Sequence, residues 1–431
     1  MMLKKIVLYG LLSVLLLITI TSCGSSSNIG TSYPTFNSEA SLHKPYMLLI
    51  SLDGFRWDYV EKYKPQHLSN FIKNGVSAES LISTFPSKTF PNHYSIATGM
   101  YPENHGILSN IFYSNKKNKV YSIRNRETVT DGDFYGGTPI WMLADRNKMV
   151  TASYFFVGSD VEIRGVRPTY SKDYDGKIKN ETRVSQVLDW LALPKKQRPH
   201  LITMYFSDMD DTGHRYGPNN ESEIKKALFN LDENLGDLFA GVKATGLPVN
   251  IIIVSDHGMA AMSTANLIPI ETIQNDSLFL AIDNGSMVNI HPKDGVEIDA
   301  VFEYLKQNEG HYEVYKTEDT PGFEYLPKNK DWGAFQLIPD PGYYFSNEKN
   351  MMLLKQNNIS TIGVHGFDSE NKDMHGIFYA NGPAFKKGYT LPSFQNIDIY
   401  PLICEILGFE IPNNIDGTIS NVQDALNPDN D

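Results

Sequence analysis

Six residues of this chain carry side chains that commonly bind divalent metal ions: Asp53, Asp210, His214, Asp256, His257 and His365. Carboxylate oxygens mixed with imidazole nitrogens suit zinc, and manganese or iron can occupy similar sites. Two such ions in one site can stabilise the entering and leaving oxygens of a displacement reaction. The residue types therefore predict a two-metal hydrolase, provided that the fold brings the six side chains together.

Three short apolar segments precede the acidic residues. Residues 46–52 end at Asp53, residues 201–207 are followed by Asp208 and Asp210, and residues 249–255 end at Asp256. Continuous apolar runs of this length are typical of strands buried on both faces of a parallel sheet. Open α/β sheets collect their chemistry at the carboxyl ends of such strands, although a single acid there often only caps the next helix.

The spacing of the histidines adds to this prediction. Asp210 and His214 lie four residues apart, and the nearby Gly213 and Gly217-Pro218 favour a loop or a single turn, with a solvated acidic turn as the alternative. Asp256 and His257 are adjacent, so they can reach one ion only where the backbone turns sharply, as Gly258 permits. The alternative for this pair is a helix cap followed by an exposed histidine.

Thr89 lies in a loop with prolines at positions 86 and 91, just before a predicted helix. A threonine at a helix N-terminus is most often a cap. Beside a metal ion, however, its hydroxyl can become a nucleophile, and the helix end favours a bound phosphate. Asn92 and His93 are assigned structural roles.

Strands and helices alternate through most of the chain. Strands are predicted at residues 46–52, 76–83, 150–156, 201–207, 249–255 and 375–379, and helices at residues 65–74, 91–98, 138–147, 183–192, 221–239 and 397–407. This order predicts an α/β fold with a mostly parallel central sheet flanked by helices. Residues 265–360 interrupt the alternation with short mixed segments and are predicted to form an inserted cap.

The N-terminus reads as a bacterial lipoprotein signal. Residues 1–22 combine Lys4 and Lys5 with a short apolar run, and Ile20-Thr21-Ser22-Cys23 resembles a lipobox with Cys23 as the acylated residue. A transmembrane anchor is the alternative, but the run is short for a bilayer. We expect a flexible tether at residues 23–44, a catalytic domain at residues 45–410, a tail at residues 411–431, and attachment to the cell envelope, at the outer membrane facing the periplasm.

Composition narrows the class of partners. The chain has 431 residues, 41% of them hydrophobic, and a formal net charge of −12, which is ordinary for a globular protein. Cys404 is the only cysteine besides Cys23, so a lipidated chain has no intramolecular disulfide. No basic tract interleaved with aromatic residues is visible, and an acidic surface repels nucleic acid backbones, so binding to a nucleic acid duplex is not expected.

Seven motifs, in order, resemble the nucleotide pyrophosphatase/phosphodiesterases of the alkaline phosphatase superfamily. The resemblance spans roughly residues 45–410, and its motifs are residues 51–56 (SLDGFR), 86–94 (PSKTFPNHY), 99–107 (GMYPENHGI), 158–160 (GSD), 210–218 (DDTGHRYGP), 255–259 (SDHGM) and 363–368 (GVHGFD). It implies an alkaline-phosphatase-like fold that holds two zinc ions, the first bound by Asp53, Thr89, Asp256 and His257 and the second by Asp210, His214 and His365. It also implies that Thr89 is the nucleophile of a phosphothreonine mechanism and that Asn110 donates to a phosphoryl oxygen.

The substrate implied by the resemblance is a nucleotide-type phosphodiester or pyrophosphate, cleaved to nucleoside monophosphates. Phe90 matches the aromatic residue that stacks on a base, and Tyr170 and Tyr174 are candidates for a second one, while Phe156-Val157 replaces the usual Trp-Pro before Gly158. The alternatives are a phosphomonoesterase, which would need cations such as Arg164 and Arg167, a choline-headgroup or lysophospholipid phosphodiesterase, and a metal-stabilised binding protein without catalysis.

Overall fold

A computed structural model describes residues 34–428. The predicted signal segment, the lipidation site Cys23 and the first part of the tether lie outside this range. Among the described residues, no helix is both long and apolar enough to cross a bilayer.

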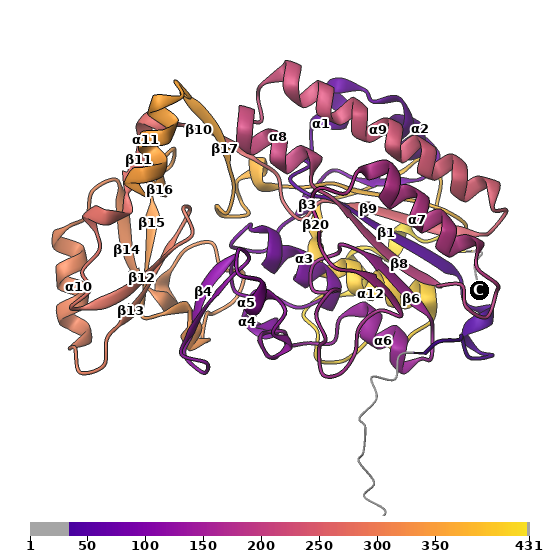
Figure 1. The fold of residues 1–431 in the computed structure, drawn as a ribbon, viewed down its shortest axis with the longest axis horizontal. Coiled ribbons are helices and arrows are strands. Elements are labelled where there is room, and N and C mark those ends of the chain that lie inside the picture. The colour runs from indigo at the N-terminus through magenta and orange to yellow at the C-terminus, as the bar shows by residue number, and fades with distance from the viewer. Residues whose placement is uncertain (1–33, 429–431) are drawn as a thin grey trace, which may run out of the picture. The chain divides into compact units, whose positions relative to one another are not determined.

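An eight-stranded sheet forms the centre of the protein (Figure 1). In spatial order its strands are β19 (Tyr389–Leu391), β2 (Val76–Ala78), β18 (Phe378–Asn381), β9 (Val249–Val254), β1 (Tyr46–Leu52), β8 (Leu201–Phe206), β6 (Thr151–Tyr154) and β7 (Tyr170–Lys172). Strand β1 pairs in parallel with both β8 and β9, and only β18 runs antiparallel to its neighbours. Every residue of β1 is buried, which explains why the segment shows no alternation of polar and apolar residues. The predicted, mostly parallel α/β sheet is confirmed.

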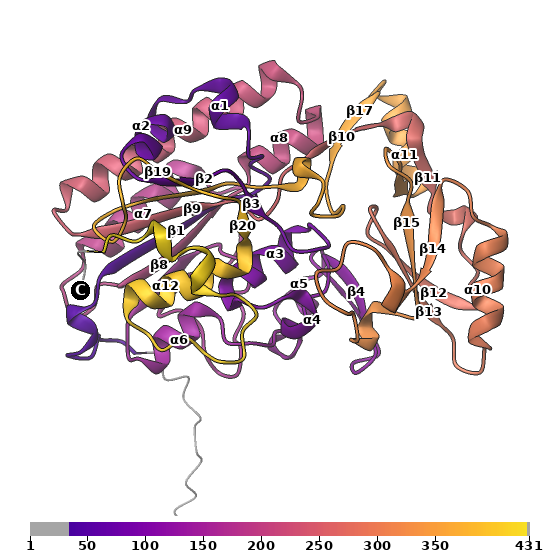
Figure 2. The ribbon, with the colours of Figure 1, turned by 180° about the vertical axis from the view of Figure 1, so that it is seen from behind.

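Helices cover both faces of this sheet (Figures 1 and 2). On β1, Leu48 and Ile50 point to one apolar cluster and Met47 and Leu49 to another. The first cluster contains residues of α1 (Tyr59–Tyr63), α2 (Gln66–Lys73), α7 (Asn180–Ala192), α8 (Asp208–Tyr216) and α9 (Glu221–Ala244). The second contains residues of α3 (Thr89–Thr98), α6 (Ile140–Arg146) and α12 (Ile399–Leu407).

A smaller unit is inserted between two strands that act as its stem. Strands β10 (Ala260–Ser263) and β17 (Thr361–Val364) pair antiparallel, and residues 264–360 between them form the unit that we call the cap. It contains a four-stranded sheet with its own apolar core. Its elements are β11 (Leu267–Pro269), β12 (Phe279–Asp283), β13 (Val288–Pro292), α10 (Ile298–Gln307), β14 (Tyr312–Lys316), β15 (Phe335–Pro339), β16 (Tyr344–Ser346) and α11 (Glu348–Gln356).

Short elements link the sheet to the cap. The hairpin of β4 (Ile111–Ser114) and β5 (Lys119–Ser122) lies beside the cap sheet in both views (Figures 1 and 2). It is flanked by α4 (Pro102–His105) and α5 (Arg126–Val129).

Two predicted strands are shorter than expected. Instead of one strand at residues 76–83, β2 is followed by β3 (Leu81–Ile82), which pairs with β20 (Phe394–Gln395). Strand β6 stops at Tyr154 because Phe155 adopts a left-handed backbone conformation with φ of 69°.

Candidate active site

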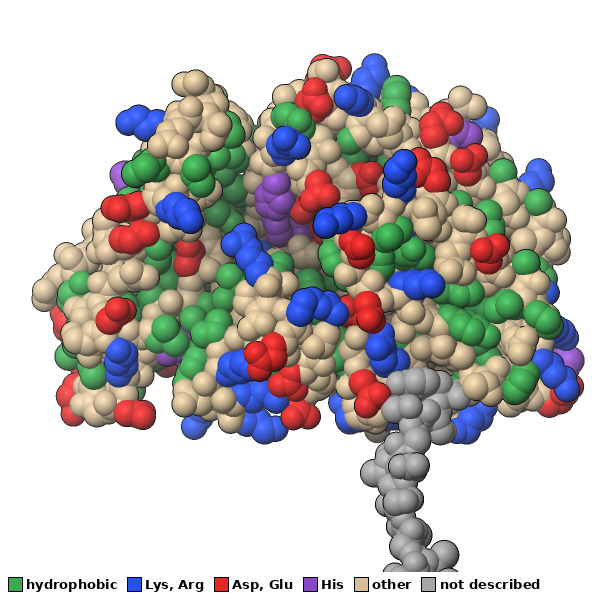
Figure 3. Space-filling model, viewed as in Figure 1, with side chains coloured by type: hydrophobic (Ala, Val, Ile, Leu, Met, Phe, Trp, Pro, Cys, Tyr) green, Lys and Arg blue, Asp and Glu red, His purple; other side chains and the backbone are tan. Residues whose placement is uncertain are grey.

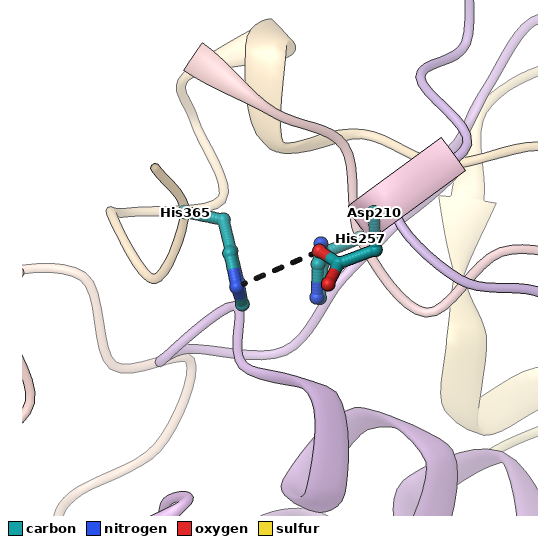
Figure 4. Close-up of side chains that lie close together, drawn as sticks. All are labelled: Asp210, His257 and His365. Carbon is teal, nitrogen blue, oxygen red and sulfur yellow. Dashed lines mark ion pairs between the residues drawn. The ribbon is translucent and has the colours of Figure 1, made fainter. Parts of the chain in front are cut away.

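The carboxyl ends of three adjacent strands bring the predicted acids together. Strand β1 lies between β8 and β9, and Asp53, helix α8 and Asp256 follow directly after these three strands. His365 reaches the same place from the cap stem, just after β17. Figure 4 shows Asp210, His257 and His365 approaching one another from three different elements. The structure therefore collects all six predicted ligands, although they are far apart along the chain.

Asp53, Asp256 and His257 form a buried cluster. The Nε2 atom of His257 lies 3.1 Å from Asp256 Oδ2 and 3.4 Å from Asp53 Oδ1. The backbone N–H of Gly54 donates to the other oxygen of Asp256 at 3.2 Å. Gly258 permits this geometry by its small size, because a Cβ atom there would lie 2.1 Å from the carbonyl oxygen of Asp373.

Asp210, His214 and His365 form a second, more exposed cluster. Asp210 Oδ1 lies 3.3 Å from His214 Nε2 and 3.9 Å from His365 Nε2. The predicted loop or single turn at these positions is wrong, because Asp210 and His214 share one face of helix α8. Gly213 allows helix α8 to pack closely against Met259, because a Cβ atom there would lie 3.1 Å from the Met259 side chain.

Three histidines present the same ring nitrogen to the carboxylates. The Nδ1–H groups of His257, His214 and His365 each donate to a main-chain carbonyl at 2.8 Å, belonging to Gly258, Gly363 and Ser87 respectively. Nε2 is then the atom with the free lone pair. Burial lowers the pKa of His257 and lowers that of His365 well below its ordinary value, which favours the neutral form of both rings. Metal-binding histidines are held in this way.

One oxygen of each of the three carboxylates also lacks a hydrogen-bond donor. Asp53 Oδ1, Asp210 Oδ1 and Asp256 Oδ2 are buried without a hydrogen-bond partner, and the lone pairs of Nε2 atoms face them. Burial, followed by repulsion from Asp256, raises the pKa of Asp53 well above its usual value, and burial also raises that of Asp210. A cation between these facing acceptors would stabilise them. The donor set fits divalent metal ions.

Atoms that could bind ions group around two points. The ligand atoms of Asp210, His257 and His365 lie within 4.8 Å of one another, as do those of Asp53, His93 and Asp256. His257 belongs to the first group, and its Nε2 atom also lies 3.1 Å from Asp256 Oδ2 of the second. Its ring stacks on that of His365 at a centroid distance of 3.6 Å.

His93 and Tyr205 also contact the buried cluster, although neither is among the ligands predicted from the sequence. His93 Nδ1 lies 3.2 Å from Asp256 Oδ2 and 2.9 Å from the Thr89 carbonyl oxygen, while Nε2 lies 2.7 Å from the Ser51 hydroxyl. The hydroxyl of Tyr205 donates to Asp53 Oδ2 at 2.5 Å. The available signals were the four-residue spacing of His93 from Thr89 on a helix and a tyrosine near the end of an apolar strand.

Thr89 is the first residue of α3, and its hydroxyl oxygen lies 3.3 Å from His257 Nε2. The loop before it is held by the buried side chain of Asn92, which accepts from the Thr84 N–H and donates to the carbonyls of Pro86 and Lys88. The structural role predicted for Asn92 agrees with these contacts. Thr89 therefore has a fixed position at a helix N-terminus beside both clusters.

Asn110 lies beside the start of the same helix. Its Oδ1 atom accepts the backbone N–H of Phe90 at 2.9 Å. Because the amide oxygen is used in this way, the Nδ2 donor remains available for an oxygen bound near Thr89.

A pocket of about 270 Å³ adjoins the clusters. Its lining includes Asp53, Thr89 and Asp210, together with the rings of Phe90 and Tyr174 and the side chains of Phe156 and Val157. Histidine side chains are visible in a hollow of the surface between the cap and the sheet domain (Figure 3). Arg126 and Asp160, which pair at 2.9 Å, also line the pocket.

Tyr170, Arg164 and Arg167 lie outside the pocket lining. The Tyr170 ring stacks on Trp190, and its hydroxyl donates to the carbonyl of Gln197. The interpretation of Tyr170 as a base-stacking residue has no support from this position, because strand β7 directs the side chain to the packing of the sheet edge. Arg164 donates to the carbonyls of Tyr135 and Gly137, and Arg167 pairs with Asp173 at 2.7 Å.

Comparison with known proteins places this site in a family. The family described as type I phosphodiesterase / nucleotide pyrophosphatase matches residues 47–368. The chain is 34% identical to the bis(5'-adenosyl)-triphosphatase enpp4 of Mus musculus over 403 residues, covering 92% of this chain and 84% of the relative. It is also 34% identical to ectonucleotide pyrophosphatase/phosphodiesterase family member 1 of Mus musculus, but spans only 43% of that longer protein.

Solved structures agree with this assignment. The murine ectonucleotide pyrophosphatase/phosphodiesterase 5, solved as an inactive threonine-to-alanine variant in complex with AMP, superposes with a TM-score of 0.81 at 31% identity. The match covers 89% of this chain and all of the other.

Proposed function

The chain belongs to the type I phosphodiesterase / nucleotide pyrophosphatase family, and from this we propose that it cleaves nucleotide phosphodiester and pyrophosphate bonds through a phosphothreonine at Thr89. It is an enzyme of the nucleotide pyrophosphatase/phosphodiesterase class. The finer proposal names the nucleophile, two zinc ions and a nucleoside monophosphate product.

Thr89 carries the proposal, because its hydroxyl lies at a helix N-terminus, 3.3 Å from His257 Nε2, and lines the pocket. The Thr89 oxygen forms a bond to phosphorus while the bond from phosphorus to the leaving oxygen breaks. Water then cleaves the phosphothreonine and releases the nucleoside monophosphate. The Asn110 amide donates to an oxygen of the phosphoryl group and stabilises the charge that develops on it.

Two zinc ions would be held by the residues of the two clusters. We assign Asp53, Thr89, Asp256 and His257 to one ion, and we assign Asp210, His214 and His365 to the other. When bound, the ions supply positive charge that lowers the pKa of the Thr89 hydroxyl and offsets the charge of the phosphoryl oxygens. The orphaned carboxylate oxygens and the Nε2 atoms that face them support metal binding by this set of residues.

The nucleoside would occupy the pocket beside Thr89. Phe90 and Tyr174 both line it, and aromatic faces of this kind stack on any base. The murine structural relative, which was solved with AMP, supports a nucleoside monophosphate as the ligand. Arg164 and Arg167 are the cations that a phosphomonoesterase would need. Both have partners outside the pocket, so they do not support that alternative.

The test is a comparison of two substrates. We expect kcat/KM of the zinc-loaded enzyme for the p-nitrophenyl ester of thymidine 5'-monophosphate to exceed that for p-nitrophenyl phosphate by at least about 10²-fold, equivalent to about 2.7 kcal/mol of transition-state binding. A preference for the monoester would overturn the proposed substrate class while leaving the fold and the clusters unchanged.

We also propose that the enzyme is anchored in a bacterial cell envelope through a lipid on Cys23. The support is the lipobox-like sequence Ile20-Thr21-Ser22-Cys23. In a bacterial host, Cys23→Ala should move the protein from the membrane fraction to the soluble fraction, and an unchanged distribution would argue against the anchor.

A further inference from the structure

One side chain of the cap reaches the catalytic loops and holds both neighbours of Asn110. Asn284 lies in the turn between β12 and β13 and is only 8% exposed. It contacts Ser109 and Ile111, the residues on either side of Asn110, although 175 and 173 positions of the chain separate it from them.

The Asn284 amide uses every hydrogen bond that an asparagine side chain can make. Its Oδ1 atom accepts from the Ser109 hydroxyl at 2.8 Å and from the Ile111 N–H at 3.2 Å. Its Nδ2 group donates to the Ile111 carbonyl at 2.9 Å and to Asn289 Oδ1 at 3.2 Å. The side chain therefore binds Ile111 in the way a neighbouring strand would, through both backbone groups.

Asn110 is consequently fixed on two sides. Its carbonyl accepts the N–H of Ile123, the residue after β5, at 3.0 Å. Asn284 holds the residues before and after it. Because the Asn110 side chain also accepts the Phe90 N–H, the direction of its Nδ2 donor depends on where Ser109 and Ile111 lie.

The cap holds Asn284 rigidly. The Asn284 N–H donates to the Met287 carbonyl within the turn, and the Phe345 N–H donates to the Gly285 carbonyl. Behind Asn284, a buried chain of amides continues from Asn289 to Gln336 at 2.7 Å, and from Gln336 to the Thr317 hydroxyl at 3.0 Å. Buried polar chains of this kind are stable only when all members are satisfied, which makes them selective for one geometry.

We propose that Asn284 is a positioning residue that sets the orientation of Asn110, so that the cap contributes to phosphoryl transfer without touching the substrate. The role rests on the proposed function of Asn110. A misplacement of about 1 Å can cost on the order of 10²-fold in rate, so a loose Asn110 loop would lose much of what its donor contributes.

A double-mutant cycle tests this role. We expect Asn284→Ala to lower kcat/KM for the thymidine ester by about 10- to 100-fold. In the Asn110→Ala background the same substitution should change kcat/KM by less than threefold, because the donor that it positions is already gone. Equal losses in both backgrounds would show that Asn284 acts only through general stability, and would overturn the role.

Asn115→Ala is the matched control, since Asn115 also joins the β4–β5 hairpin to the cap, through hydrogen bonds to Lys330 and Asp331 rather than to residues 109–111. It should leave kcat/KM within about twofold of the wild type. A loss like that of Asn284→Ala would mean that any cap contact matters, and would overturn the specific role.

Ser109→Ala and hydrogen exchange extend the test to the case in which Asn284→Ala does not fold. Ser109→Ala removes one bond to Asn284 from the core side, and we expect it to lower kcat/KM about three- to tenfold, again only when Asn110 is present. Amide exchange of Ile111 should become faster in either variant, and unchanged exchange and activity would overturn the role. Absence of diester hydrolysis by the wild type would instead overturn the proposed function, and with it this role.

Discussion

The sheet domain and the cap contribute differently to one site. The sheet domain supplies Thr89 and the predicted ligands that follow β1, β8 and β9, while the cap stem supplies His365. The residues that line the pocket all lie between positions 53 and 211. Among the described residues, the cap supplies none of the pocket lining. The difference indicates that the sheet domain carries the reactive groups and that the cap stabilises the positions of their loops.

The cap contacts the Thr89 loop as well as the segment that carries Asn110. Besides Asn284, Tyr344 accepts from the buried Lys88 ammonium at 3.1 Å, next to Thr89. Glu324 accepts the Phe85 N–H at 3.1 Å, at the start of the Thr89 loop. Lys88 also donates to the His365 carbonyl, so the same contact reaches the second cluster.

The largest expected effect lies in the sheet domain. Thr89→Ala should lower kcat for diesters by at least about 10³-fold, because the nucleophile is removed. Thr89→Ser keeps a hydroxyl and should retain measurable turnover. Zinc measured by mass spectrometry should stay near two ions per chain in Thr89→Ala, since Asp53, Asp256 and His257 remain. Activity within tenfold of the wild type would rule out Thr89 as the nucleophile.

A smaller effect in the sheet domain concerns substrate selectivity. Tyr174→Ala should raise KM for nucleotide diesters by about 5- to 20-fold, the low end of base-stacking energies for a ring that is 48% exposed. It should not change KM for bis(p-nitrophenyl) phosphate, which lacks a base, and Tyr170→Ala should change neither. If Tyr170→Ala raises KM for nucleotide diesters as much as Tyr174→Ala does, the assignment of the base to the pocket beside Tyr174 is wrong.

The smallest effect is expected in the cap and concerns stability. Burial raises the pKa of Glu324 to about 7, with Asp368 as an acidic neighbour. The folded protein then keeps a proton that the unfolded chain loses above its ordinary pKa of 4.5, so the free energy of unfolding falls as pH rises from there to about 7. Glu324→Gln removes the titrating carboxyl group. Between pH 5 and pH 8 the Tm of this variant should therefore fall by about 1 to 3 °C less than the Tm of the wild type. Parallel Tm curves in differential scanning calorimetry would count against the raised pKa.

Much of the site followed from local sequence patterns. The apolar runs before Asp53 and Asp256 predicted buried parallel strands, and the structure places β1 and β9 there. The turn predicted at Asp210 is wrong because a glycine is also compatible with a helix. Gly213 lies within helix α8, where its small size makes room for the side chain of Met259. A glycine that permits close approach cannot be distinguished in sequence from one that permits a turn.

Side chains acting across long distances were not predictable in the same way. Tyr170 and Tyr174 are four residues apart, and only the direction of strand β7 and the loop after it decides which of them lines the pocket. Nothing local to Asn284 indicates that its amide would bind residues on either side of Asn110.

By itself, the sequence determined which chemical groups are available and which segments become buried strands, because burial and strand propensity are properties of short segments. Only the tertiary structure decided that His93 and Tyr205 contact the buried carboxylates, that Arg164 and Arg167 point elsewhere, and that the cap holds the Asn110 loop. These outcomes depend on packing between elements that are distant in the chain, and each is settled by distances of a few ångströms that no local pattern encodes.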